Sequence, residues 1–324
     1  MNKNRLMIIA VACAMALATT VATAQNYPEK PVRVVVPFPP GGAADIIARH
    51  VTQKLSESLG KQFIVDNRAG AGGAIGTDYA AHAAPDGYTV LVASSSTMSI
   101  NPHIVAKSPY DPIKSFTPVA LVGYAPNVLV VHPSVPAKSV KELISIAKGR
   151  PQALSFASNG SGTLSHLTGE LFKQRAGIEL LHVPYKGAAP AVIDTMAGQV
   201  SMLFAAYPSV AAQERAGKLR ALAVTSAKRI EVAPQLATVA ESALPGFESN
   251  QWWGLYGPAG MAAAITARLN TELNKILRTA DIKQRLAADG AEPGGGTPND
   301  LAVYLKNDFE KWGKVIRTAG IKDE

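Results

Sequence analysis

Two loops of small residues follow apolar, strand-like runs and could hold an anion. The first is Pro39-Pro40-Gly41-Gly42-Ala43, and the second is Asn159-Gly160-Ser161-Gly162-Thr163. A helical pattern follows each loop, and a helix start presents unpaired backbone N–H groups and about half a positive charge. Because glycine lets a ligand approach the backbone closely, these loops predict a site for a carboxylate or phosphate that needs no cationic side chain.

Both loops also fit a purely structural interpretation. Glycine, serine and threonine are common in turns and at helix caps, so each loop taken alone is explained by local backbone chemistry. Asp45 lies in the first predicted helical turn, where we expect it to cap the backbone, because its charge would repel an anion. The presence of two such loops in different parts of the chain favours binding.

The usual sequence marks of catalysis are missing. The chain contains no GxSxG, HExxH or GxxxxGK[ST] motif and no Cys/His cluster. The run 70–76 has Ile75 where a dinucleotide loop needs its third glycine, so we interpret it as a turn into a helix. Among the isolated histidines, His166 is one turn after Thr163 and could reach a lobe interface. We predict no catalytic residue, no metal site and no cofactor.

The charge of the chain gives little support to nucleic-acid binding. The formal net charge is +8, and 17% of the residues are charged. The basic residues are scattered, with no run of five or more and no aromatic stacking motif among them. A mild positive balance agrees with an anionic ligand but does not require one.

The N-terminus has the three parts of a secretory signal. Lys3 and Arg5 precede the apolar run 6–17, and the small residues 22–24 follow it. We predict cleavage after Ala24 and export to the periplasm, which leaves a mature chain without cysteine because Cys13 is the only one. The run is shorter than the roughly 20 residues that span a bilayer. Acylation of Cys13 is the competing interpretation, but apolar residues follow it where a polar tether is expected.

Strand-like and helical patterns alternate along the mature chain. This alternation predicts βαβ units and an α/β fold with a largely parallel sheet. Predicted strands are 32–36, 62–65, 89–93, 154–157, 179–183, 200–204 and 219–225. Predicted helices are 43–59, 76–84, 163–176, 190–197, 263–279, 281–288 and 300–316.

The mature chain is long enough for two hydrophobic cores. Two stretches have the pattern of crossings between lobes, namely 119–131, which is broken around Tyr124-Ala125-Pro126, and the proline-containing segment between Thr225 and Trp253. We therefore predict a first lobe from 25–125 together with about 229–324, and a second lobe from about 126–228.

An ordered series of motifs resembles one family along nearly the whole mature chain. The series begins with YPEKPVR (27–33) and VPFPPGG (36–42) and continues with NRAGAGG (67–73), PDGYT (85–89), HVPYKG (182–187), GKLRALAVT (217–225) and LPGF (244–247). The chain is similar to the substrate-binding receptors of tripartite tricarboxylate transporters, the Bug-type family.

The resemblance implies a type II periplasmic binding protein with two lobes, each a mixed, mostly parallel sheet flanked by helices. In such relatives a carboxylate is held between the lobes by backbone amides, hydroxyls and bridging waters. Ala205 and Ala206 stand where many relatives have an aspartate, which disfavours an amino-acid ligand. By motif, the expected ligand-binding residues are Phe38, Pro40, Gly41, Gly42, Ala43, Ser95, Ser96, Thr97, Ser158, Asn159, Gly160, Ser161, Gly162, Thr163, His166, Tyr185, Lys186, Gly187 and Ala205.

The leading functional hypothesis is a monomeric, non-catalytic receptor. It would close its lobes around a small mono- or dicarboxylate and deliver that ligand to the membrane components of a tripartite tricarboxylate transporter. A ligand sensor for a membrane signalling protein would use the same closed surface, so the sequence leaves that alternative open. A periplasmic hydrolase is the third hypothesis, and it has the least support because of the missing motifs.

Overall fold

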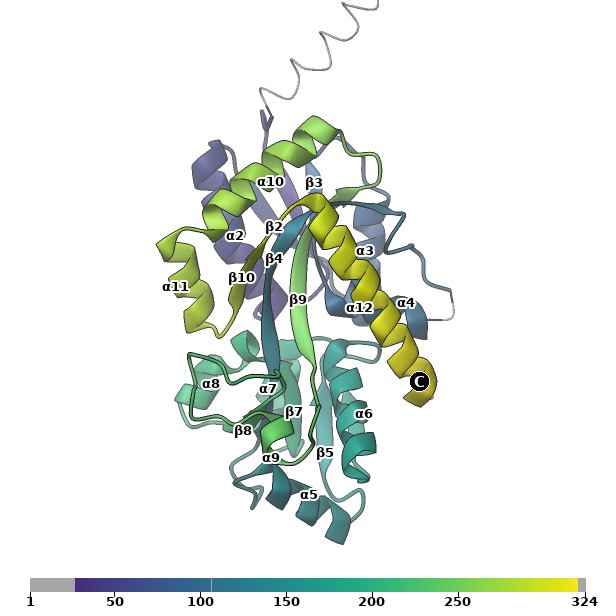
Figure 1. Cartoon of the computed structure of the whole chain (residues 1–324), viewed down its shortest axis with the longest axis vertical. Coiled ribbons are helices and arrows are strands. Elements are labelled where there is room, and N and C mark those ends of the chain that lie inside the picture. Colours follow the sequence, from purple (N-terminus) through teal and green to yellow (C-terminus); the bar gives the residue numbers. More distant parts are fainter. Residues whose placement is uncertain (1–26, 106, 320–324) are drawn as a thin grey trace, which may run out of the picture.

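The computed structural model describes residues 27–105 and 107–319. The predicted signal sequence, its cleavage site and Cys13 lie outside the described residues. Within these ranges, every helix is too short or too polar to cross a bilayer. Figure 1 shows two lobes stacked along the long axis, with β4 and β9 running between them.

The first lobe is built on a sheet in the order β2-β1-β3-β9-β4, with β10 on the far side of β4. β1 is parallel to β2 and β3, whereas β9 is antiparallel to β3 and β4. The strands are β1 (Val32–Val36), β2 (Phe63–Asn67), β3 (Thr89–Ser94), β4 (Phe116–Val131), β9 (Asn250–Pro258) and β10 (Glu292–Gly295).

Eight helical segments pack in this lobe. Val34 and Val36 of β1 are fully buried against Ile47 and Val51 of α2 in its main hydrophobic core. The segments are α2 (Ala43–Leu59), η1 (Ala71–Gly73), α3 (Ala74–Ala81), η2 (Ser96–Ile100), α4 (Asn101–Ile104), α10 (Ala263–Leu277), α11 (Ala280–Ala288) and α12 (Pro298–Ala319).

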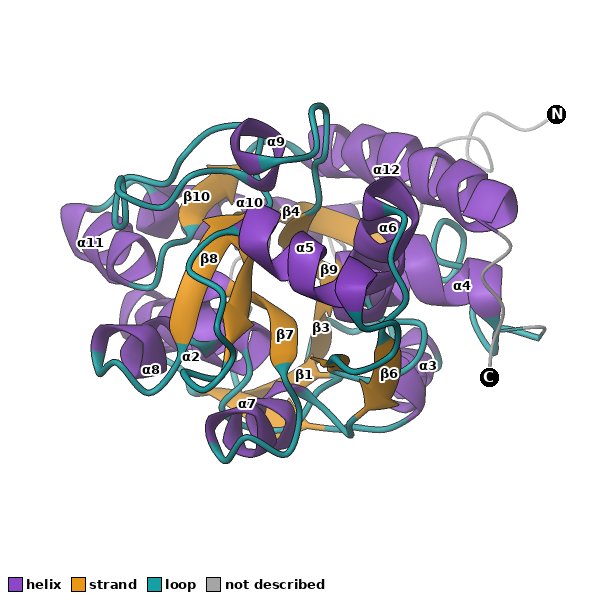
Figure 2. Ribbon diagram, turned by 90° about the horizontal axis from the view of Figure 1, so that it is seen from below, coloured by secondary structure: helices purple, strands orange, loops and turns teal. Residues whose placement is uncertain are grey.

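The second lobe is a smaller sheet in which β7 lies between β4 and β5. β5 is parallel to β6 and β7, and both β7 and β8 are antiparallel to β4. Helices lie on both sides of the strands when the molecule is seen from below (Figure 2). The elements are α5 (Val140–Gly149), β5 (Ser155–Ser158), α6 (Leu164–Ala176), β6 (Leu181–Pro184), α7 (Ala188–Met196), β7 (Met202–Ala206), η3 (Tyr207–Ser209), α8 (Ala211–Arg215), β8 (Arg220–Val224) and α9 (Val239–Ser242).

β4 belongs to both sheets. Its first part pairs with β9 as far as Pro126, and the part from Asn127 onward pairs with β7 and β8. The sequence predicted two halves broken near Pro126. The strand is instead continuous there, because the fixed φ of proline is compatible with an extended chain.

The segment after β8 packs with the second lobe. Ile230 and Leu236 join one of its cores, and Val239 and Phe247 join the other. From the sequence, we expected the chain to re-enter the first lobe near residue 229. The apolar side chains as far as Phe247 instead bury against the nearest second-lobe sheet, and the chain reaches the first-lobe sheet through β9.

Candidate ligand-binding site

A small cavity lies where the two lobes meet. Its volume is about 30 Å³, and one water needs about 10 to 15 Å³. In this arrangement of the lobes the cavity is therefore smaller than a carboxylate with a carbon chain. The lining residues are Phe38, Gly42, Ala43, Ala44, Ser94, Ser96, Asn159, Ala188, Ala206, Ser209, Gln251 and Trp253.

The first-lobe wall contains the N-terminus of α2. Gly42 is the N-cap and supplies no side-chain hydrogen bond. The N–H of Ala43 donates across the lobes to Ser209 Oγ at 2.9 Å, and the first N–H to bond within the helix is that of Ile46, to Gly42 O at 3.0 Å. The N–H groups of Ala44 and Asp45 precede that bond, so this helix end can donate to an anion.

The second-lobe wall contains the N-terminus of α7. Its N-cap residue is Gly187, so no side chain accepts a hydrogen bond from the first N–H groups of the helix. Ala188, the first residue of the helix, lines the cavity. The two helix starts are adjacent, because a Cβ built on Gly42 would lie 3.5 Å from Ala188 Cβ. Two partial positive charges from opposite lobes thus meet at one place, which suits a single negative group bridging the lobes.

Asp45 is structural, as the sequence suggested. Its carboxylate accepts hydrogen bonds from Gly41 N–H at 3.0 Å, Arg49 Nε at 2.9 Å and Asn67 Nδ2 at 3.0 Å. Burial by itself would raise the pKa of Asp45, but these hydrogen bonds outweigh burial and lower it. The ionised carboxylate therefore holds the loop before α2 in place, and its charge is balanced by hydrogen-bond donors of the first lobe.

Neutral hydroxyl and amide groups form the remaining polar surface. Two cavity-lining atoms, Ser94 Oγ and Asn159 Oδ1, are buried and have no hydrogen-bond partner among the described residues; the same holds for Ser95 Oγ, which is outside the lining. Ser96 Oγ accepts from Leu164 N–H at 3.0 Å across the lobes. Unpartnered buried polar atoms carry a desolvation penalty, so they favour a ligand that bonds to them.

No charged side chain is among the described residues that line the cavity. A bound anion would therefore depend on helix ends, hydroxyl groups and amides. Of the sequence-predicted residues, five line the cavity: Phe38, Gly42, Ala43, Ser96 and Asn159.

Three other predicted residues are outside the cavity lining and form local hydrogen bonds. Thr97 Oγ1 donates to Ser94 O at 3.2 Å, and Thr163 Oγ1 donates to Gly160 O at 2.6 Å. The hydroxyl of Tyr185 donates to Asp194 at 2.8 Å, within the second lobe. These hydrogen bonds hold the turns and the second-lobe loop that carry the predicted residues.

Several predicted residues face solvent or the opposite lobe. Pro40, Gly41 and Lys186 are exposed, whereas Ser161 is partly exposed. Gly162 faces the first lobe, where a Cβ built on it would lie 3.2 Å from Asn101 Nδ2. At Gly187, a Cβ would lie 2.6 Å from Pro39 Cγ, so the two lobes touch there with no space for a side chain.

His166 lies behind the second-lobe loop. It is 2% exposed, and its Nδ1 accepts from Gly162 N–H at 3.3 Å. Its ring stacks on His182 at 4.1 Å, and His182 Nε2 forms a hydrogen bond with Ser158 Oγ at 2.7 Å. Burial, with a smaller contribution from Lys173, lowers the pKa of His182 to about 4. These rings support the loop from inside the second lobe.

The cavity face of β7 carries Ala206, the neighbour of the predicted Ala205. Ala206 lines the cavity, while the fully buried Ala205 packs in the second-lobe core. Successive side chains in a strand point to opposite faces, so these two neighbours lie on different sides of the second-lobe sheet.

Sequence reasoning also missed Ala44, Ser94, Ala188, Ser209, Gln251 and Trp253. Ser94 and Ser209 each follow an apolar strand, and this position could have identified them. Ala188 follows Gly187 at a helix start. Gln251 is a buried polar residue in the apolar run of β9, but sequence alone does not show where that run lies.

A small cavity between two α/β lobes, with β4 running through both sheets, is typical of a two-lobed solute-binding protein. The sequence model of the tripartite tricarboxylate transporter family receptor matches residues 47–321. The chain therefore belongs to the tripartite tricarboxylate transporter receptor family, whose members are periplasmic solute-binding receptors.

Individual relatives agree along almost the full length. Protein BugT of Bordetella pertussis is 38% identical over 324 residues, which cover 99% of each chain. The solved structure of R. palustris Rpa4515 with adipate is 38% identical with a TM-score of 0.90, covering 91% of this chain and 99% of that one. The structure of MatC from Rhodopseudomonas palustris with bound malate is 32% identical with a TM-score of 0.85, covering 90% of this chain and all of that one.

Proposed function

We propose that this receptor binds a small organic carboxylate between the N-termini of α2 and α7. The observation that carries the proposal is the meeting of two helix starts from opposite lobes, each with a glycine N-cap that offers no side-chain acceptor. A carboxylate placed there accepts N–H groups from both lobes at once. Each such charge-assisted hydrogen bond contributes about 1.5 to 3 kcal/mol.

The relatives support the same ligand class. One relative was solved with adipate, a six-carbon dicarboxylate, and another with malate, a four-carbon dicarboxylate. In this chain Ala206 and the hydroxyl of Ser209 form part of the second-lobe wall, where no ammonium group would find a carboxylate partner. We propose a mono- or dicarboxylate without an amino group.

The proposed receptor performs no chemistry on its ligand. The pairing of Ser158 with His182 is the arrangement closest to a nucleophile and a base, but Ser158 is fully buried and its Oγ also accepts from Gly160 N–H at 3.2 Å. That oxygen is therefore covered by the protein in this arrangement of the lobes. The pair instead stabilises the turn after β5.

We further propose that the exported, monomeric chain delivers its ligand to the membrane components of a tripartite tricarboxylate transporter. The signal would be cleaved after Ala24. The lobes would rotate about β4 near Pro126–Asn127 and about the start of β9 near Ser249–Asn250. This division assigns about 127–249 to the second lobe and the rest of the mature chain to the first, and it rests on the change of strand partners and on the packing of Phe247.

Melting-temperature shifts test the proposed ligand class. Adipate, malate, succinate and benzoate would be compared with matched amides that lack the negative charge. A ligand at 100 times its dissociation constant adds about 2.7 kcal/mol to the free energy of unfolding. We expect at least one carboxylate to raise the melting temperature and its amide to have no effect. Equal shifts by acid and amide, or a shift by none of the carboxylates, would refute the proposal, and mass spectrometry of the recovered ligand would reveal any turnover.

A further inference from the structure

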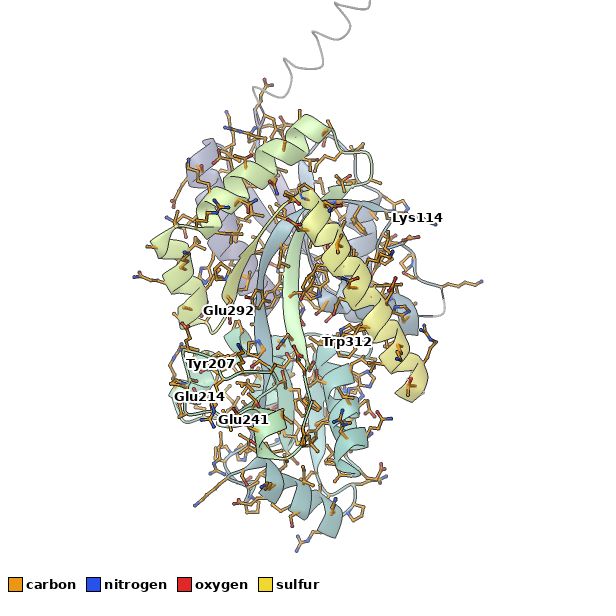
Figure 3. The ribbon with its side chains drawn as sticks, in the orientation of Figure 1. Lys114, Tyr207, Glu214, Glu241, Glu292 and Trp312 are labelled. Atoms are coloured by element: carbon orange, nitrogen blue, oxygen red, sulfur yellow. The ribbon has the colours of Figure 1, made fainter. Side chains whose placement is uncertain are left out.

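Helix α12 packs against both lobes. It runs diagonally from the first lobe to the side of α6 (Figure 1). Trp312 lies at the level where the lobes meet (Figure 3). We call the buried apolar residues at this junction the interlobe cluster: Ile100, Ile104, Leu164, Leu167, Trp312 and Ile316.

The first lobe holds α12 firmly. Trp252 Nε1 donates to Asp308 Oδ2 at 2.8 Å, and His103 Nε2 lies 2.9 Å from Phe309 O. The ring of His103 fills the space left by Gly313, where a Cβ would lie 2.6 Å from His103 Cε1. Because these contacts all join first-lobe elements, α12 should move with the first lobe when the lobes separate.

The second lobe contributes Leu164 and Leu167 from the first turn of α6. Both side chains are fully buried, and Ile316 is 3% exposed. Separation of α6 from α12 would expose this apolar surface to water, which is unfavourable. The interlobe cluster therefore stabilises the closed arrangement of the lobes.

The same elements also reach the ligand cavity. η2 carries Ser96 into the cavity wall and Ile100 into the interlobe cluster. The loop before α6 carries Asn159 into the cavity, and Leu164 N–H donates to Ser96 Oγ at 3.0 Å. Loss of the cluster would thus release the element that brings the second-lobe wall to the ligand.

We propose that Ile316 and Leu167 are positioning residues that set the receptor's apparent ligand affinity without touching the ligand. Packing of the interlobe cluster, to which both residues belong, favours the closed form, and a ligand that needs the closed form binds more weakly when that form is less populated. The affinity part of this inference rests on the proposed carboxylate function. The conformational part does not, because closure can be measured without a ligand.

The test compares Ile316→Ala with Val303→Ala, a similar truncation at a half-exposed site on the same helix, where Val303 is 50% exposed. Small-angle scattering of ligand-free protein should show a larger radius of gyration for Ile316→Ala only. With adipate as the probe, we expect a roughly tenfold higher dissociation constant for Ile316→Ala, mainly through faster dissociation. Ile316→Leu should restore both values.

A double-mutant cycle shows whether the two residues act together through the interlobe cluster. Leu167→Ala should weaken adipate binding similarly, and the double variant should cost less than the two single effects added together. Wild-type scattering equal to that of Ile316→Ala would overturn the proposal, as would additive effects. If adipate binds to none of the proteins, the ligand class is wrong, and the scattering comparison still decides the role of the cluster. If Ile316→Ala does not fold, Ile316→Val takes its place.

Discussion

Replacement of Gly187 by alanine should hold the lobes apart. The added Cβ would lie 2.6 Å from Cγ and 2.7 Å from Cδ of Pro39, in the opposite lobe, whereas ordinary contacts begin at 3.4 Å. Both groups are stiff, because one is a proline ring and the other is a Cβ at the start of α7. The clash is therefore relieved most easily by separating the two loops by about 0.8 Å, the difference between 2.6 and 3.4 Å.

A separation of this size is enough to weaken binding. It would lengthen the interlobe bond from Ala43 N–H to Ser209 Oγ from 2.9 Å to about 3.7 Å, beyond hydrogen-bond range. A carboxylate that bridges α2 and α7 would lose at least one bond of about 1.5 to 3 kcal/mol. Since about 1.4 kcal/mol is a tenfold change, we expect affinity to fall by about 10- to 100-fold.

Calorimetric titration with adipate measures the effect, and two further variants separate its causes. Alanine at Gly187 also strains the backbone, because φ is +118° there. Gly177→Ala supplies strain alone, since Gly177 has φ +61° and a Cβ there meets nothing within 4 Å. We expect Gly177→Ala to lower the free energy of unfolding by about 1 to 2 kcal/mol with unchanged affinity. Pro39→Ala combined with Gly187→Ala should recover much of the lost binding.

The reasoning fails if Gly187→Ala binds adipate as tightly as wild type does. It also fails if Gly177→Ala loses as much affinity as Gly187→Ala, because backbone strain and not lobe contact would then be the cause.

Three further outcomes follow from individual contacts. Ser209→Ala removes the acceptor of the Ala43 N–H, and we expect several-fold weaker adipate binding with little change in melting temperature; a large loss of stability would contradict this. His182 has its pKa lowered from 6.5 to about 4, so the unfolded chain binds the proton first as the pH falls, and stability present above pH 6.5 should decline between 6.5 and about 4 by at most roughly 3 kcal/mol. The melting temperature of His182→Gln should change less with pH in that window than the melting temperature of the wild type. Equal pH dependence of the two proteins would refute the lowered pKa of His182. The pKa of Asp45 is lowered in the folded protein, so its ionised carboxylate stabilises the fold at pH values above the usual pKa of 3.8. This stabilisation is lost as the pH falls below 3.8. Asp45→Asn should therefore lower the free energy of unfolding by about 1 to 3 kcal/mol at pH 7 and much less near pH 3, as checked by urea denaturation.

Local sequence signals located much of the first lobe. The apolar run 32–36 forms β1 as predicted, and the helix expected from Ala43 ends at Leu59 with Gly60 at φ 68°. These features depend on a few neighbouring residues: a β-branched run buried on both faces, a helical period and a glycine that adopts a left-handed conformation at low cost.

β9 escaped prediction because its signal is not local. Gln251, Trp252, Trp253 and Leu255 are all buried, so both faces of the strand are covered and the alternating pattern of a half-exposed strand is absent. Its partners, β3 and β4, lie more than a hundred residues away in the sequence, and only their pairing makes the run a strand.

The sequence by itself determined the α/β class, the family resemblance and the glycine-led helix starts, because each depends on residue types within a short window. Only the tertiary structure decided which of those starts meet. Gly42 and Ala188 are far apart in the chain and become neighbours when the lobes close, and the same closure brings Ser209 to Ala43 and Ile316 to the α6 helix. Contacts of this kind depend on the angle between two lobes that share the continuous strand β4, and no short stretch of residues encodes that angle.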